Sequence, residues 1–184
     1  MSLTVKVSCD VNAPMEVLWE TLCDVKNRPT FVSRVTKVEF KKRSKNHGLV
    51  TIHPEEFVHQ EGSLWVVESL FQGKTFRSID SITSMRKPNT SDNDKTASVQ
   101  ISSQFLDKRF STRNRAVHIG TFTIEALNEK RCRLHGSLGF LPGGCWGALD
   151  LWMRKRQIQK LAPLWMREYL TEFATEAEKR SGKQ

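Results

Sequence analysis

The sequence predicts an α+β fold in which one antiparallel sheet is covered by a long helix at the end of the chain. Residues 147–179 read as that helix, because their apolar side chains recur at intervals of three or four residues and so form one stripe. The stripe consists of Ile158, Leu161, Ala162, Trp165, Tyr169 and Phe173. Before it, seven segments have strand patterns, and the short helices are grouped near the start rather than alternating with strands.

The first part of the chain has the alternating apolar pattern of a strand, followed by the start signal of a helix. Residues 3–9 place apolar side chains at every second position, which is typical of a half-buried strand. Asn12 and Pro14 then mark a helix start, since Asn favours the cap and Pro the first turn. This helix is expected to run from Pro14 to about Cys23, and Pro29 opens a second short helix.

The middle of the chain consists of strand patterns separated by polar turns. Residues 48–58 fit neither period, and Pro54 marks a strand edge or a break within them. Six segments follow the strand pattern and, with the first strand, predict a sheet of seven. They span residues 35–40, 64–71, 75–85, 96–105, 117–127 and 132–141.

Pro163 interrupts the last helix, and it is expected to kink the helix because proline lacks a backbone N–H group. Two interpretations are open. The kink is either a static bend that follows the sheet or the hinge of an entrance to a space beneath the helix.

Length and composition are those of one soluble domain. We expect a single domain over residues 1–180 and a disordered tail over residues 181–184. No apolar run approaches the roughly 20 residues of a membrane span, and the first residues lack the pattern of a signal peptide, so a cytoplasmic location is expected. The net charge of +9 favours anionic partners, or it simply provides a basic, soluble surface.

Motifs in the first 40 residues resemble those of the helix-grip superfamily, which includes START, pollen-allergen and polyketide cyclase/dehydrase-like proteins. The matching residues are Asn12-Ala13-Pro14-Met15-Glu16-Val17-Leu18-Trp19, then Asp24, Pro29 and Phe31, then Val35, Val38, Glu39 and Phe40. The resemblance implies a curved seven-stranded sheet that grips the last helix, with two short helices after the first strand. It also implies a hydrophobic cavity between sheet and helix, in which such proteins bind lipids or other apolar molecules and some catalyse reactions.

Apolar and aromatic residues supply the candidate ligand-binding positions. They either line a cavity between sheet and helix or fill that space as ordinary core, since protein interiors are normally close-packed. The candidates are Trp65, Phe105, His118, Phe122, Leu138, Phe140, Trp165 and Tyr169.

Catalytic and metal-binding signals are weak. His118 has the strand parity of Phe122, so it either points into the cavity as a hydrogen-bonding or acid/base group or is a core histidine. Glu68 and Asp80 lie in apolar strands, and their direction is not determined by the pattern. Three further histidines, His47, His53 and His59, lack metal-ligand spacing, so neither a metal nor a cofactor is predicted.

A basic cluster, Arg154, Lys155 and Arg156, lies in the first half of the long helix. It indicates either contact with an anionic membrane or a solvated charged face. Aromatic residues are not interleaved with the basic residues as in a stacking platform, so no nucleic-acid binding is predicted.

Three functions are compatible with these patterns. The first is binding or transport of a hydrophobic small molecule or lipid in the cavity. The alternative is a polyketide cyclase/dehydratase-like enzyme that uses the same cavity. The third is an interaction protein with a filled core.

Overall fold

A computed structural model describes residues 3–44, 48–71, 73–89, 95–106, 117–142 and 144–182. The elements follow the predicted order of one strand, two short helices, further strands and a long helix. They are β1 (Leu3–Val11), α1 (Met15–Cys23), α2 (Arg28–Phe31), β2 (Val35–Arg43), β3 (Leu49–Thr51), a short 3-10 helix (Pro54–Glu56), β4 (Leu64–Phe71), β5 (Lys74–Arg86), β6 (Thr96–Phe105), β7 (Val117–Asn128), β8 (Arg131–Leu141) and α4 (Gly144–Ser181).

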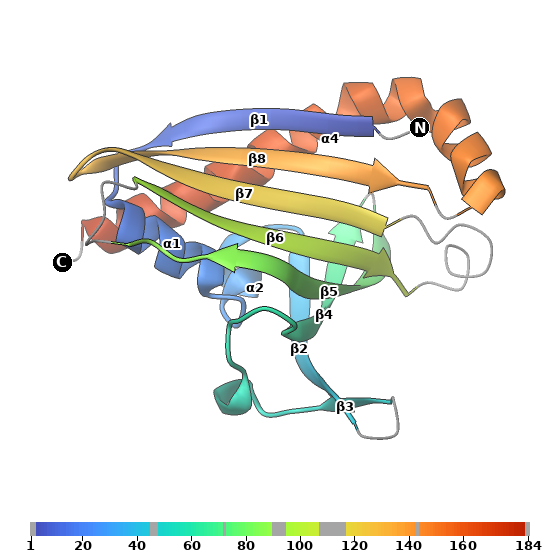
Figure 1. Cartoon of the computed structure of the whole chain (residues 1–184), viewed down its shortest axis with the longest axis horizontal. Coiled ribbons are helices and arrows are strands. Elements are labelled where there is room, and N and C mark those ends of the chain that lie inside the picture. The colour runs from blue at the N-terminus through green and yellow to red at the C-terminus, as the bar shows by residue number, and fades with distance from the viewer. Residues whose placement is uncertain are drawn as a thin grey trace.

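The strands form one antiparallel sheet in the order β1-β8-β7-β6-β5-β4-β2-β3. Figure 1 shows β2 and β4 turned away from the direction of β1, β8 and β7, so the sheet curves, and α4 crosses the face inside that curve. Within the described residues the sheet has eight strands rather than the predicted seven. The additional strand, β3, pairs only three residues with β2, which is too short to produce a clear alternating pattern.

The helices bury the faces that the sequence pattern predicts. In α1 the inward residues include Val17, Leu18 and Thr21. In α4 the buried residues continue along one stripe as far as Ala177, and Pro163 lies inside the helix. Figure 1 shows that the N-terminal part of α4 curves away from the line of its C-terminal part.

Helix α4 lies close to the sheet at Gly136 of β8. A Cβ atom at this position would lie 2.8 Å from the Sδ atom of Met166 and 3.0 Å from a methyl carbon of Leu170. Both distances are shorter than ordinary van der Waals contacts, so the packing of helix on sheet depends on the missing side chain.

The strand register places one row of side chains across the concave face. Neighbouring strands pair Phe40 with Trp65, Trp65 with Asp80, Asp80 with Ser103, Ser103 with His118, and His118 with Phe140. Because paired residues in a sheet point to the same side, this row decides that Asp80 faces α4. The direction of Asp80, which the pattern left open, is therefore set by pairing.

His118 lies within this row between two phenylalanines. Its ring centroid is 5.0 Å from that of Phe105 and 4.8 Å from that of Phe140, both in edge-on arrangements. Burial lowers the pKa of His118 to about 4, because an apolar surrounding disfavours the charged imidazolium.

None of the helices in the described ranges combines the length and apolar character needed to cross a membrane. Helix α4 ends at Ser181, which is the first residue of the predicted tail. Residues 183 and 184 of that tail lie outside the described residues.

We expect Gly136→Ala to lower the free energy of unfolding by about 1–3 kcal/mol, because the new methyl group pushes against Met166 and Leu170. Gly139→Ala is the matched control in the same strand, since a Cβ atom there meets only the carbonyl oxygen of Ile119 at 3.7 Å. Urea denaturation of both variants measures the difference. Equal stabilities would show that α4 does not depend on the close approach at Gly136.

His118 predicts a loss of stability in acid. Its folded pKa of about 4 lies below its ordinary value of 6.5, so folding favours the neutral ring. The contribution of neutral His118 to the free energy of unfolding is complete above about pH 6.5. It is lost as the pH falls towards 4, by at most about 1.4 kcal/mol per pH unit. His118→Phe should reduce this slope in urea denaturation between pH 6.5 and 4. An unchanged slope in His118→Phe would contradict the burial of a neutral histidine.

Candidate functional site

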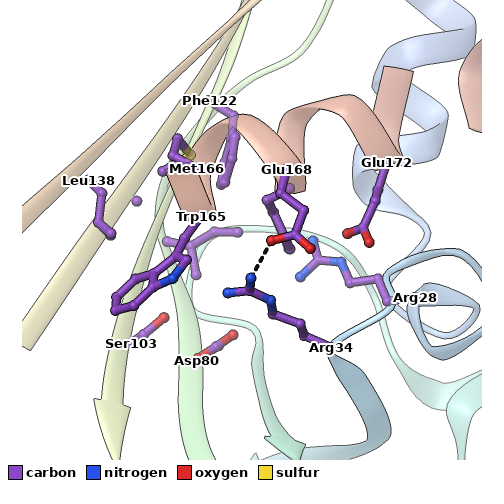
Figure 2. A pocket seen from close by; sticks show the side chains of 13 residues that line it. Arg28, Arg34, Asp80, Ser103, Phe122, Leu138, Trp165, Met166, Glu168 and Glu172 are labelled. Atoms are coloured by element: carbon purple, nitrogen blue, oxygen red, sulfur yellow. Dashed lines mark hydrogen bonds and ion pairs between the residues drawn. The ribbon is translucent and has the colours of Figure 1, made fainter. Parts of the chain in front are cut away.

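A pocket of about 240 Å³ lies between the concave face of the sheet and the middle of α4. Figure 2 shows its side chains converging from the helix on one side and from the strands on the other. The apolar wall is made by residues of β6, β7, β8 and α4. These residues are Ile101, Gly120, Phe122, Leu138, Trp165, Met166 and Tyr169.

The pocket has a polar inner end at β5 and β6, where Asp80 and Ser103 line it. Asp80 is only 9% exposed, and one carboxylate oxygen accepts a hydrogen bond from Ser78 at 3.0 Å. Burial raises the pKa of Asp80, and the hydroxyl of Ser103 together with the charge of Arg28 opposes that rise. Asp80 is therefore a buried carboxyl group at the pocket wall with partners on the protein side.

Arg28 supplies the opposite charge at this end. It is 3% exposed and donates a hydrogen bond from Nη2 to the carbonyl oxygen of Leu22 at 3.0 Å. Its guanidinium carbon lies 5.6 Å from the ring centroid of Trp65 and 5.7 Å from that of Phe173, which are cation–π distances. The Nε atom of Arg28 is buried without a hydrogen-bond partner. Arg28 thus brings a buried cation with an unused donor to the pocket.

The indole N–H of Trp65 is a second donor near this end. Trp65 is fully buried and pairs with Asp80 across β4 and β5. Its N–H helps to oppose the rise in the pKa of Asp80, yet it forms no hydrogen bond of normal geometry. The polar end therefore has more donor capacity than its protein neighbours use.

The segment between α2 and β2 also borders the pocket. Arg34 forms an ion pair with Glu168 of α4, which Figure 2 marks with a dashed line. Four residues along α4, Glu172 accepts a hydrogen bond from the backbone N–H of Ser33 at 3.0 Å. Side chains of Arg34 and Glu168 are 35% and 48% exposed, so this ion pair lies where the pocket meets solvent.

Tyr169 lines the pocket from the helix side. Its ring lies 4.8 Å from the ring of Phe173 and 5.9 Å from that of Phe122, centroid to centroid. Burial raises the pKa of Tyr169, so the phenol remains a neutral donor at physiological pH.

The structure brings together half of the residues nominated from the sequence. Phe122, Leu138, Trp165 and Tyr169 line the pocket. The other four do not line it. Trp65 packs behind Asp80 beneath Arg28, whereas Phe105, His118 and Phe140 form an aromatic row farther along the sheet.

Sequence reasoning missed the charged residues of the pocket. Arg28 precedes Pro29 at the start of a short helix and looks like a surface residue in the sequence. Arg34, Glu168 and Glu172 are polar positions that face the pocket mouth. Asp80 alone gave a signal, because a carboxylate inside an apolar strand demands a partner.

Metal binding finds no support among the side chains that the structure describes. No group of three or more His, Cys, Asp or Glu residues within those ranges lies close enough to hold an ion. The arrangement can instead orient an organic molecule, because it combines an apolar wall with a few buried donors and acceptors.

Solved structures with similar folds were found, although no family model and no curated protein matches the sequence. The Zhui aromatase/cyclase from Streptomyces sp. R1128 is 15% identical, with a TM-score of 0.63 over 98% of this chain and 96% of that one. A START superfamily protein from Mycobacterium smegmatis is 13% identical, with a TM-score of 0.60 over 96% and 97%. Norcoclaurine synthase from Thalictrum flavum, in complex with dopamine and hydroxybenzaldehyde, is 10% identical, with a TM-score of 0.54 over 97% and 88%.

These likenesses extend over nearly the whole chain at low identity, so they concern the fold. Together with the antiparallel sheet wrapped on α4, they show that this chain has the helix-grip fold.

Proposed function

We propose that this protein binds a small hydrophobic molecule in the pocket between the sheet and α4. The observation that carries the proposal is the pocket itself, which has an apolar wall on three strands and the helix and buried polar groups at one end. Such a combination provides affinity through apolar contact and orientation through a few polar contacts. The similar fold of a synthase solved with two small aromatic molecules supports the proposal by analogy only.

Filling the pocket should abolish binding without unfolding the protein. Gly120 lines the pocket. A Cβ atom at Gly120 would lie 3.5 Å from its nearest neighbour, a ring carbon of Phe122, which is an ordinary contact distance. Gly120→Leu therefore directs a new side chain into the open space of the pocket. We expect the affinity for the neutral two-ring probe 1-naphthylamine to fall at least about tenfold, which corresponds to about 1.4 kcal/mol. Probe fluorescence measures the affinity.

Gly139→Leu is the control for this experiment, because Gly139 has the opposite strand parity and should retain the affinity. Thermal unfolding of both variants confirms that they are folded. Equal probe affinity in wild type and Gly120→Leu would contradict binding in this pocket.

A second candidate function is catalysis of the cyclase or dehydratase type. The observation that favours it is the buried carboxyl of Asp80, whose pKa burial raises, in the same pocket as the neutral phenol of Tyr169. Carboxyl groups whose pKa is raised by burial are typical general acids and bases of enzyme active sites. Turnover of a polyketide-like substrate that is lost in Asp80→Asn would favour this function over simple binding.

We also propose that the first half of α4 contacts anionic membrane surfaces. Arg154, Lys155 and Arg156 lie beside Trp152 and Met153, which are 64% and 63% exposed. Basic residues attract anionic headgroups, and exposed aromatic and thioether side chains partition into the interface. Adsorption would bring a ligand-binding protein to a source of apolar molecules.

Reversing Arg154, Lys155 and Arg156 to Glu should strongly reduce co-sedimentation with phosphatidylserine-containing vesicles at low salt, because each basic residue contributes about 1 kcal/mol of attraction. The control reverses Lys26, Lys87 and Lys130, which are exposed elsewhere on the protein, and so changes the net charge equally. A similar loss in both variants would show that overall charge, rather than this helix, drives adsorption.

A further inference from the structure

The polar end of the pocket contains one buried charge of each sign. Arg28 and Asp80 both line the pocket and are 3% and 9% exposed. Asp80 accepts a hydrogen bond from Ser78, whereas the Nε atom of Arg28 has no partner. Burying a polar group without a hydrogen bond is unfavourable, so this end is built to receive a polar group from outside the chain.

The charge balance selects against an anionic ligand. The formal charges that line the pocket are the cations Arg28 and Arg34 and the carboxylates of Asp80, Glu168 and Glu172. At the mouth Arg34 is already paired with Glu168. A ligand carboxylate next to Arg28 would therefore share that one cation with Asp80. Two buried carboxylates beside a single cation leave one negative charge uncompensated, which is strongly disfavoured.

A hydroxyl group satisfies this end with no added charge. Its oxygen can accept a hydrogen bond from a donor such as Arg28, and its hydrogen can be donated to a carboxylate such as Asp80. Hydrogen bonds to charged groups are about twice as strong as those between neutral groups. The residues that remain along the wall, including Phe122 and Trp165, are apolar and suit a flat ring system.

The volume limits the size of the ligand. An engineered cavity of about 150 Å³ holds benzene, and pockets for drug-sized ligands span roughly 300–1,000 Å³. At about 240 Å³ this pocket lies between these limits. One or two fused rings fit such a space, whereas a sterol or a two-chain lipid does not.

We propose that the pocket selects an uncharged molecule of one or two rings that carries a hydroxyl group, with the hydroxyl at the Arg28 and Asp80 end. This inference rests on the proposed binding function and adds the chemical class and size of the ligand.

The test displaces the neutral two-ring fluorophore 1-naphthylamine from the wild-type protein at pH 7 with four probes: naphthalene, 2-naphthol, 2-naphthoate and cholesterol. We expect 2-naphthol to bind at least about tenfold more tightly than naphthalene, which lacks the hydroxyl, and than 2-naphthoate, which carries a charge. Cholesterol should cause no displacement.

Asp80→Asn tests the role of the carboxylate. The amide has the same shape and no charge, and the raised pKa of Asp80 indicates that this site tolerates a neutral group. We expect the affinity for 2-naphthol to fall about tenfold. The affinity for 2-naphthoate should rise, because Arg28 then has no competing carboxylate beside it. The affinity for naphthalene should stay unchanged. Glu68→Gln is the control, because it removes the same charge from a residue that does not line the pocket. Glu68 has the strand parity opposite to Trp65 in β4 and so points to the other face of the sheet. This variant should leave the preference for 2-naphthol intact.

The outcomes separate the two proposals. If none of the naphthalene-sized probes binds, the proposed binding function fails. If they bind with equal affinity, or if 2-naphthoate binds best, binding stands and the selection of a hydroxyl is wrong. Displacement by cholesterol would overturn the size limit. A uniform loss of affinity for all probes in Asp80→Asn would reduce Asp80 to a structural role and would also overturn the inference.

Discussion

The buried guanidinium of Arg28 is the constraint on which the rest of the site depends. Taking a cation out of water costs several kcal/mol, and here three parts of the chain offset that cost. The end of α1 accepts a hydrogen bond through the carbonyl oxygen of Leu22, and the rings of Trp65 in β4 and Phe173 in α4 lie within 6 Å of the cation. Arg28 therefore joins the short helices to both the sheet and the long helix, at the point where the pocket begins.

The same cation controls the protonation of its neighbours. Burial raises the pKa of Asp80 and of Tyr169, and the charge of Arg28 opposes that rise. Burial lowers the pKa of His59 to about 4, and the charge of Arg28 contributes to that decrease. The ring of His59 stacks on Trp65 at 6.3 Å, and both of its nitrogens are buried without partners. The polar end of the pocket thus rests on a second layer of aromatic and neutral groups, which holds Arg28 and Asp80 in place while leaving donor capacity for a ligand.

Much of the fold could be predicted from the sequence, because helices and strands with one buried face have distinct periods. The apolar stripe of α4, the strand at Leu64–Phe71 and the inward face of α1 are examples. β3 was missed because three residues carry no period. The site was harder to predict, since strand parity tells which face a residue occupies but not how far along that face the pocket extends. His118 shares parity with Phe122 yet lies outside the pocket, and Arg28 reaches the pocket only through tertiary packing.

The most direct test of the account is to locate a bound ring compound by NMR. Intermolecular nuclear Overhauser effects from the ring protons of 2-naphthol should reach the methyl groups of Leu138, Ile101 and Met166, which line the pocket from two strands and the helix. Such contacts would place the ligand between sheet and helix, with the aromatic wall around it. Effects confined to exposed methyl groups, such as those of Leu49 and Val50, or no effects at saturating ligand, would contradict a binding pocket beneath α4.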